Sequence, residues 1–364
     1  MKTKTRQKWL LFLIVFLILL IVGFIFLIGH ETTSAPKIGL ILTGKTDDPG
    51  WNGTHYAGIM GACEKLGAKL YVEENVAESS EACGAAIEKL AREGVSMIIL
   101  SSYAYPEKVM DFMQKYPDIA FYTSSAEISL PNLTTYFGRM YQARYLAGIV
   151  AGMKTETGSI GYVAAMENPE VIRGINAFTL GVHSVNPDAT VHVILTGSWE
   201  NEIAEKDAAT RLINEVNVDV LTYHHNKPTV ASVADAAGIY SIGYNEIVSG
   251  LSDKHLTSTA WNWQPLYYEI IREFVSGKAN TSNLRWLGLE SKVIGLSDYS
   301  SMVTPEIQQA VTNAQADIVA GKDIFFGEIY DNTGVLRCES GEALSDEYLM
   351  KQLDWYVDGV VIYE

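Results

Sequence analysis

From Lys37 onward, short apolar runs alternate with longer stretches of helical periodicity, and this alternation limits the chain to few folds. Each run has the length of one strand, and most runs are apolar throughout. Strands of that kind are buried on both faces, as in parallel sheets whose crossover helices cover both sides. The repeated strand–helix order therefore predicts an α/β protein built from open parallel sheets.

The expected elements form two successive series of similar length. The strands are expected at Ile38–Leu42, Lys69–Glu73, Met97–Leu100, Ala120–Tyr122 and Leu133–Tyr136, and then at Ser159–Val163, Thr190–Leu195, Val218–Thr222 and Tyr240–Ile242. The helices are expected at Trp51–Leu66, Ser79–Glu93, Pro106–Lys115, Tyr141–Met153, Pro169–Val185, Asn201–Glu215 and Val230–Ala237. Two such series predict two lobes with a cleft between them.

Later segments are expected to return through a hinge between the lobes. They are Leu256–Trp261, a helix at Gln264–Ser276, a strand at Lys292–Leu296, a helix at Pro305–Val319 and a short helix near Asp346–Trp355. The expected boundaries are 37–140 plus 259–292 for lobe I, and 141–258 plus 293–364 for lobe II.

The N-terminal region predicts a membrane segment. Trp9–Ile28 is an uncharged apolar run of about 20 residues, the length that crosses a bilayer. Residues 1–8 form a basic flank that predicts a cytoplasmic N-terminus, and 29–36 read as a tether. The run exceeds the apolar core of a usual signal peptide, so an uncleaved anchor is favoured over a cleaved signal segment. In either case the folded part is expected outside the cytoplasm.

Charge and cysteine content narrow the partners. The formal net charge of -16 argues against nucleic acid and against docking on anionic lipid. Three cysteines, Cys63, Cys83 and Cys338, are too few for a disulfide framework. Buried free thiols are expected at Cys63 and Cys83, and a bridge between these two is the alternative. No CxxC or His-x-x-x-His spacing occurs, so neither a metal site nor a cofactor is predicted.

Aromatic residues gather where strands of the predicted sheets end. Of the seven tryptophans, Trp51, Trp199, Trp261 and Trp263 follow predicted strands. Ligands of open α/β sheets bind at these strand ends, and tryptophan faces suit a flat aromatic ligand. The alternative for Trp261 and Trp263 is packing within the hinge.

Other polar residues of these loops leave alternatives open. His224 and His225 are candidates for hydrogen bonding to a ligand, and metal binding is disfavoured. Arg139 is expected to pair with a ligand carboxylate, with Asp47 or with Asp48, and a structural ion pair is favoured.

The chain has no G-x-S-x-G, G-x-x-x-x-G-K-[ST] or G-x-G-x-x-G motif, so no enzyme is predicted.

Four segments together resemble the basic membrane protein family of ABC-transporter substrate-binding proteins. They are DDPGW at 47–51, YFGRMYQARYLAGIVAG at Tyr136–Gly152, GYNE at Gly243–Glu246 and TSTAWNWQPLYYE at Thr257–Glu269. The resemblance extends from Lys37 to about Ala320. It implies a type I periplasmic-binding-protein fold with two lobes, a three-strand hinge and a ligand trapped by closure. It also implies delivery of a purine nucleobase or nucleoside to ABC permease subunits at the extracytoplasmic face of the cell membrane.

The resemblance implies a set of ligand-binding residues from both lobes and the hinge. They are Trp51, His55, Tyr103, Tyr136, Trp199, His224, Asn226, Tyr244, Trp261 and Trp263. GYNE departs from the acidic run that recognises ribose in nucleoside-binding members, which favours a free purine base such as adenine over a nucleoside. The family's lipid-attachment cysteine is also missing, so an uncleaved anchor would replace it as the tether. The alternatives are a membrane-anchored sensor or regulator with the same fold, and a binding protein for a sugar or other polar ligand.

Overall fold

The computed structural model describes residues 35–48, 50–124, 128, 130–245, 248–278 and 284–363. The predicted membrane segment Trp9–Ile28, its basic flank 1–8 and most of the tether lie outside the described residues, as does Glu246. Within the described ranges, no helix is both long enough and apolar enough to cross a membrane.

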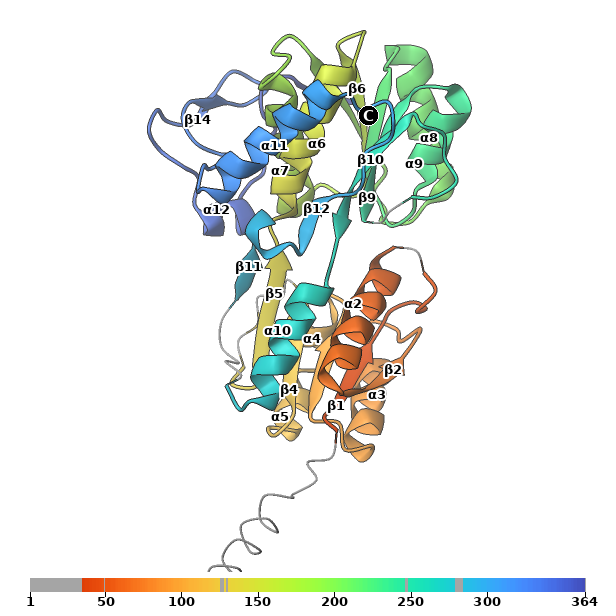
Figure 1. Ribbon diagram of the computed structural model, residues 1–364, viewed down its shortest axis with the longest axis vertical. Helices are drawn as coiled ribbons and strands as arrows, with labels where there is room; N and C mark the ends of the chain where they lie inside the picture. Colours follow the sequence, from red (N-terminus) through yellow and green to blue (C-terminus); the bar gives the residue numbers. More distant parts are fainter. Residues whose placement is uncertain are drawn as a thin grey trace, which may run out of the picture. The chain divides into compact units, whose positions relative to one another are not determined.

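The first sheet, as far as the chain is described, contains six strands in the order β11-β5-β4-β3-β1-β2, all parallel (Figure 1). The strands are β1 Lys37–Ile41, β2 Lys69–Glu73, β3 Met97–Leu100, β4 Ala120–Ser124, β5 Leu133–Gly138 and β11 Arg285–Leu287. The helices around it are α2 Trp51–Leu66, α3 Ser80–Arg92, α4 Tyr105–Lys108, α5 Met110–Lys115 and α10 Gln264–Val275. Helices α2 and α10 pack against each other although they are far apart in sequence.

The second sheet contains seven strands among the described residues, in the order β12-β10-β9-β8-β6-β7-β15. The strands are β6 Ser159–Ala164, β7 Thr190–Leu195, β8 Val220–His224, β9 Tyr240–Asn245, β10 His255–Trp261, β12 Ile294–Leu296 and β15 Val360–Tyr363. The helices are α6 Met140–Lys154, α7 Pro169–His183, α8 Glu202–Arg211, α9 Thr229–Ala237, α11 Pro305–Val319 and α12 Asp346–Lys351. The predicted α/β architecture of two lobes with parallel sheets is confirmed.

Helices α6 and α7 touch through their backbones, which explains the glycines of the AGIVAG segment. A Cβ placed on Gly148 of α6 would lie 2.0 Å from the carbonyl oxygen of Phe178 in α7. A Cβ placed on Gly181 of α7 would likewise lie 2.0 Å from the carbonyl oxygen of Tyr145 in α6. Only glycine permits such an approach.

Several local predictions differ from the structure. The helix predicted at Pro106–Lys115 is divided into α4 and α5 at Val109, whose φ of -123° and ψ of 19° are not helical. The helix predicted at Asn201–Glu215 ends at Arg211 and continues as a π-helical turn, Leu212–Val216. Strand β12 runs antiparallel to β10.

The C-terminal segment contributes strands that the residue pattern did not predict. Strand β15 pairs in parallel with β7 at the edge of the second sheet, and β13 Ile329–Tyr330 pairs with β14 Leu336–Cys338. Both hairpin strands are short, with two and three residues, and β15 is a four-residue edge strand whose Val361 and Ile362 are exposed.

Candidate functional site

A cavity of about 1360 Å³ lies between loops of the two sheets. From the first sheet it is lined by residues after β1, β2, β3 and β4, and from the second by residues after β6, β7 and β8 and by the last two residues of β9. These are the carboxyl ends of parallel strands, where open α/β sheets bind ligands. The cavity contains five of the ten predicted site residues: Trp51, Tyr103, Trp199, Asn226 and Tyr244.

The turn before α2 sets the position of Trp51. Asp48 accepts hydrogen bonds from the backbone N–H of Gly50 at 3.0 Å and from the side-chain amide of Asn52 at 2.8 Å. Asp48 therefore shapes the turn, as its place in the loop indicates. Trp51 begins α2 and donates from its indole Nε1 to the carbonyl oxygen of Ser101 at 2.9 Å. The indole thus has a fixed orientation at the cavity wall.

A buried aromatic group supports Trp51 from behind. The rings of Trp261 and Trp263 stack with centroids 4.5 Å apart and 8° between their planes. Both rings meet the indole of Trp51 edge to face, at 5.8 and 5.6 Å. Neither Trp261 nor Trp263 lines the cavity, so the structure favours the alternative of packing where β10 leads into α10.

His55 belongs to the same buried group. Its ring stacks on Trp263 at 4.4 Å, and its Nδ1 forms a short hydrogen bond with the hydroxyl of Tyr267. Burial lowers the pKa of His55 to about 3, so the imidazole is neutral near pH 7. His55 shares a helix face with Trp51, as predicted, but lies one turn deeper and outside the cavity lining.

Tyr136 of β5 does not line the cavity, because side chains alternate between the two faces of a strand. Leu133, Thr135 and Phe137 of β5 line it, so Tyr136 points to the opposite face of the sheet. There its hydroxyl lies 2.7 Å from the hydroxyl of Tyr267. Burial raises the pKa of Tyr136.

The second lobe presents Trp199 and Tyr244 to the cavity. Trp199 is partly exposed, and its carbonyl oxygen accepts from the backbone N–H of Asn226 at 3.1 Å. His224 does not line the cavity but lies behind both rings, 5.7 Å from Trp199 and 4.3 Å from Tyr244 between centroids. Trp199, Asn226 and Tyr244 therefore line the cavity together, and His224 is buried behind the rings of Trp199 and Tyr244.

His225 and the cysteines have structural environments. His225 Nε2 lies 2.7 Å from the hydroxyl of Thr196, and burial lowers the pKa of His225 to about 4. Cys63, Cys83 and Cys338 are free and buried. The described residues contain no group of three or more histidine, cysteine or carboxylate side chains that could hold a metal ion.

The first turn of α7 supplies cavity residues that the site prediction missed. The side chain of Asn168 caps this helix by accepting from the backbone N–H of Val171 at 3.0 Å. Asn168, Pro169 and Glu170 then line the cavity. An Asn-Pro pair in the loop after a strand is a helix-start signal that points to this placement. Burial raises the pKa of Glu170, against the opposing charges of Arg173 and Arg144.

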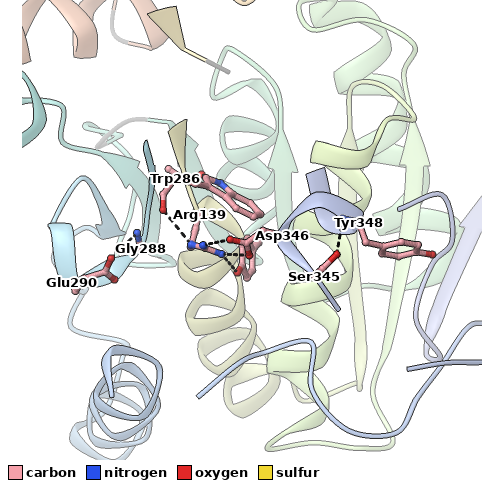
Figure 2. A network of polar contacts seen from close by, with 9 residues as sticks. Arg139, Trp286, Gly288, Glu290, Ser345, Asp346 and Tyr348 are labelled. Atoms are coloured by element: carbon pink, nitrogen blue, oxygen red, sulfur yellow. Dashed lines mark hydrogen bonds and ion pairs between the residues drawn. The ribbon is translucent and has the colours of Figure 1, made fainter. Parts of the chain in front are cut away.

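The C-terminal helix α12 also reaches the cavity, through Met350 and Lys351. Figure 2 shows how its first residue is held: Arg139 pairs with both carboxylate oxygens of Asp346, at 2.7 and 2.5 Å. The Arg139 guanidinium also lies over the ring of Trp286, 4.2 Å from its centroid. Arg139 therefore makes a structural ion pair, as favoured, but its partner is Asp346 and neither Asp47 nor Asp48.

A second arginine, on α7 of the same lobe, also holds α12. Arg173, which lines the cavity from α7, donates to the carbonyl oxygen of Leu349 at 2.5 Å. The sequence offered no short-range signal for this docking, because both contacts join residues more than 170 positions apart.

Comparison with known proteins shows the family of this chain. The family model for PnrA-like ABC transporter substrate-binding proteins matches residues 35–333, a range that includes both sheets up to β12. The chain belongs to this family. The family predicted from the residue motifs is thus confirmed, and it is a family of substrate-binding proteins and not of enzymes.

Three proteins show what this PnrA-like protein is similar to in sequence and in fold. A purine-binding protein of Brucella abortus (strain 2308) is 30% identical over 328 residues, covering 89% of this chain and 92% of that protein. A Haloferax volcanii protein named for glucose binding in an ABC transporter is 31% identical over 275 residues, 75% and 67% of the two chains. The crystal structure of a transcriptional activator of the comK gene from Bacillus halodurans superposes with a TM-score of 0.70 at 25% identity, covering 78% of this chain and 98% of that one.

The family match ends at Thr333, whereas α12 begins at Asp346. Part of the cavity wall of this PnrA-like protein therefore comes from outside the matched range.

Proposed function

We propose that this PnrA-like protein binds a purine nucleobase, adenine-like in shape, in the cavity between its lobes and presents it to an ABC importer. The observation that carries the proposal is that Trp51 of one lobe and Trp199 of the other line the same cavity. Stacking of a base on an aromatic side chain contributes about 1–3 kcal/mol per face. Two such faces on separate lobes would make ligand binding favour closure.

The proposed ligand contacts are Trp51, Tyr103, Trp199, Asn226 and Tyr244. The remaining predicted residues, His55, Tyr136, His224, Trp261 and Trp263, are proposed to hold these side chains in place, since they are buried and lie beside the cavity residues or their supports. The name of the Brucella abortus relative supports a purine as the ligand.

Closure of the lobes is the proposed mechanism. A cavity of about 1360 Å³ exceeds the usual range of small-ligand sites, about 300–1,000 Å³. The ligand would therefore stabilise a more closed arrangement, and a permease would recognise that form. We further propose that Trp9–Ile28 tethers the protein at the extracytoplasmic face of the membrane.

Two other functions are supported by specific relatives. The Haloferax volcanii relative is named for glucose, and sugars also stack on tryptophan faces. The likeness to a transcriptional activator supports a membrane-anchored regulator that uses the same site for sensing. A permease that binds the liganded form specifically would favour transport over sensing.

Calorimetry on the purified full-length protein in detergent tests the ligand. The panel is adenine, guanine, hypoxanthine, their nucleosides and glucose. Saturable binding of a purine base, with weaker binding of the nucleosides, is expected. Glucose binding without purine binding would refute the proposal.

A further inference from the structure

Glu170 is a cavity glutamate without a hydrogen-bonding partner in the described part of the chain. It lies in the first turn of α7, and about a third of its side chain is exposed (34%). His224 Nε2 lies 3.9 Å from Oε1 of Glu170, which is beyond hydrogen-bonding distance. The other cavity glutamates are engaged: Glu78 accepts from the hydroxyl of Ser102, and Glu200 pairs with Lys227 at 2.6 Å.

Unsatisfied polar atoms surround this carboxylate on the protein side. Both ring nitrogens of His224, the hydroxyl of Tyr162 and the Nε of Arg144 have no hydrogen-bonding partner among the described residues, and all three residues are buried. A Cβ placed on Gly174 of α7 would lie 3.6 Å from both His224 Nδ1 and the Tyr162 hydroxyl. Buried polar atoms are nearly always hydrogen-bonded to protein, water or ligand. His224, Tyr162 and Arg144 do not line the cavity, so Glu170 is the member of this group that a ligand can reach.

Two arginines near Glu170 influence the ionisation of its carboxyl group. Arg144 is fully buried, with its guanidinium 4.2 Å from the ring centroid of Tyr244, and it donates to the carbonyl oxygen of Tyr223 at 2.9 Å. No carboxylate lies within ion-pair distance of Arg144 in the described ranges. Burial raises the pKa of Glu170, and the opposing charges of Arg173 and Arg144 favour its ionised form. His224 is neutral because burial and Arg144 lower its pKa.

We infer that Glu170 selects ligands whose polar edge carries an exocyclic amino group, and so distinguishes amino-purines from oxo-purines. This inference rests on the proposed function, which supplies the purine. An ionised carboxylate can only accept hydrogen bonds. The 6-amino group of adenine would donate to Glu170, whereas the 6-oxo oxygen of hypoxanthine, in the same position, would meet it as a second acceptor. A site built to accept a hydrogen bond rejects an analogue that cannot donate it.

The test compares two purines that differ at one position, against two matched variants. Calorimetry with adenine and hypoxanthine is performed on the wild type, on Glu170→Gln and on Glu202→Gln, whose glutamate is exposed and does not line the cavity. The wild type should prefer adenine. Glu170→Gln should weaken adenine binding roughly tenfold or more and narrow the preference for adenine, because an amide can both donate and accept. Glu202→Gln should keep the wild-type preference.

The outcomes separate the two proposals. The assignment of Glu170 would be overturned if Glu170→Gln melts at the wild-type temperature and keeps the wild-type ratio of adenine affinity to hypoxanthine affinity. That result would leave the proposal of purine binding standing. A wild-type preference for hypoxanthine would overturn it as well. A wild type that binds neither purine would refute the proposed function and this inference with it.

Discussion

The Cβ position of Gly50 lies 2.8 Å from the backbone carbonyl oxygen of Asn226. Gly50 precedes the helix that carries Trp51, and Asn226 belongs to the second lobe, so the two lobes touch beside the cavity. A side chain at position 50 would collide with backbone, which cannot move aside as a flexible side chain can. A glycine here permits the lobes to approach.

Gly50→Ala is therefore expected to weaken ligand binding about tenfold while leaving thermal unfolding near that of the wild type. The extra methyl would hold the loops apart without entering either core. Calorimetry with the cognate ligand measures the effect. Gly295→Ala is the control, because no heavy atom lies within 4 Å of its Cβ position. Equal affinities for the two variants would contradict contact between these loops in the liganded form.

Trp51→Ala is expected to reduce ligand affinity by about 1–3 kcal/mol, the contribution of one stacked aromatic face. Trp51→Phe should retain part of that affinity, because it keeps a flat ring but loses the hydrogen bond to Ser101. Calorimetry on both variants measures the difference. Undiminished binding by Trp51→Ala would remove the aromatic wall from the proposed site.

The burial of His55 as a neutral imidazole predicts that the folded protein loses stability at acidic pH. Its pKa is about 3 in the folded protein and about 6.5 in the unfolded chain, so the unfolded state binds the extra proton. Stability from this residue is present above pH 6.5 and falls by up to about 1.4 kcal/mol per pH unit between pH 6.5 and 3. Urea unfolding at pH 7 and pH 5 measures the slope.

His55→Gln should lose stability less steeply over the same pH interval, although its stability at pH 7 should be lower than that of the wild type. His225 and His255, with pKa values lowered to about 4, will maintain part of the slope. The same pH dependence in the wild type and His55→Gln would show that His55 is not buried as a neutral residue.

Asp346→Asn should loosen α12 from Arg139 and so disturb the cavity wall formed by Met350 and Lys351. Asp346 is half exposed, so the unfolding free energy should fall by no more than about 1 kcal/mol. Ligand affinity should fall several-fold, and amide hydrogen exchange in α12 should accelerate. Asp317→Asn, which breaks an exposed pair with Lys322, should change neither. Unchanged affinity in Asp346→Asn would exclude α12 from the site.

The order of strands and helices could be predicted from local pattern because each element carries its own signals. Helices α2 and α11 begin and end at the predicted residues, Trp51–Leu66 and Pro305–Val319. Trp51 and Trp199 could be placed at the cavity because parallel strands present their following loops at one edge.

Other site residues depend on which side a residue faces and on contacts between distant segments. Tyr136 was misplaced relative to the cavity by one step of strand alternation, since Thr135 and Phe137 are the residues that line it. The sequence carries no signal that separates Glu170 from other first-turn carboxylates, and only its neighbours in the structure show that it lacks a hydrogen-bonding partner among the described residues.

The two α/β lobes, the family and the aromatic character of the cavity were predictable from the sequence, because strand length, helical periodicity and loop tryptophans are local properties of the chain. The structure was needed to show which aromatic residues face the cavity, that Arg139 pairs with Asp346, and that α12 forms part of the cavity wall. These features arise from contacts between residues far apart in the chain, whose free energy depends on burial and geometry that no short sequence pattern specifies.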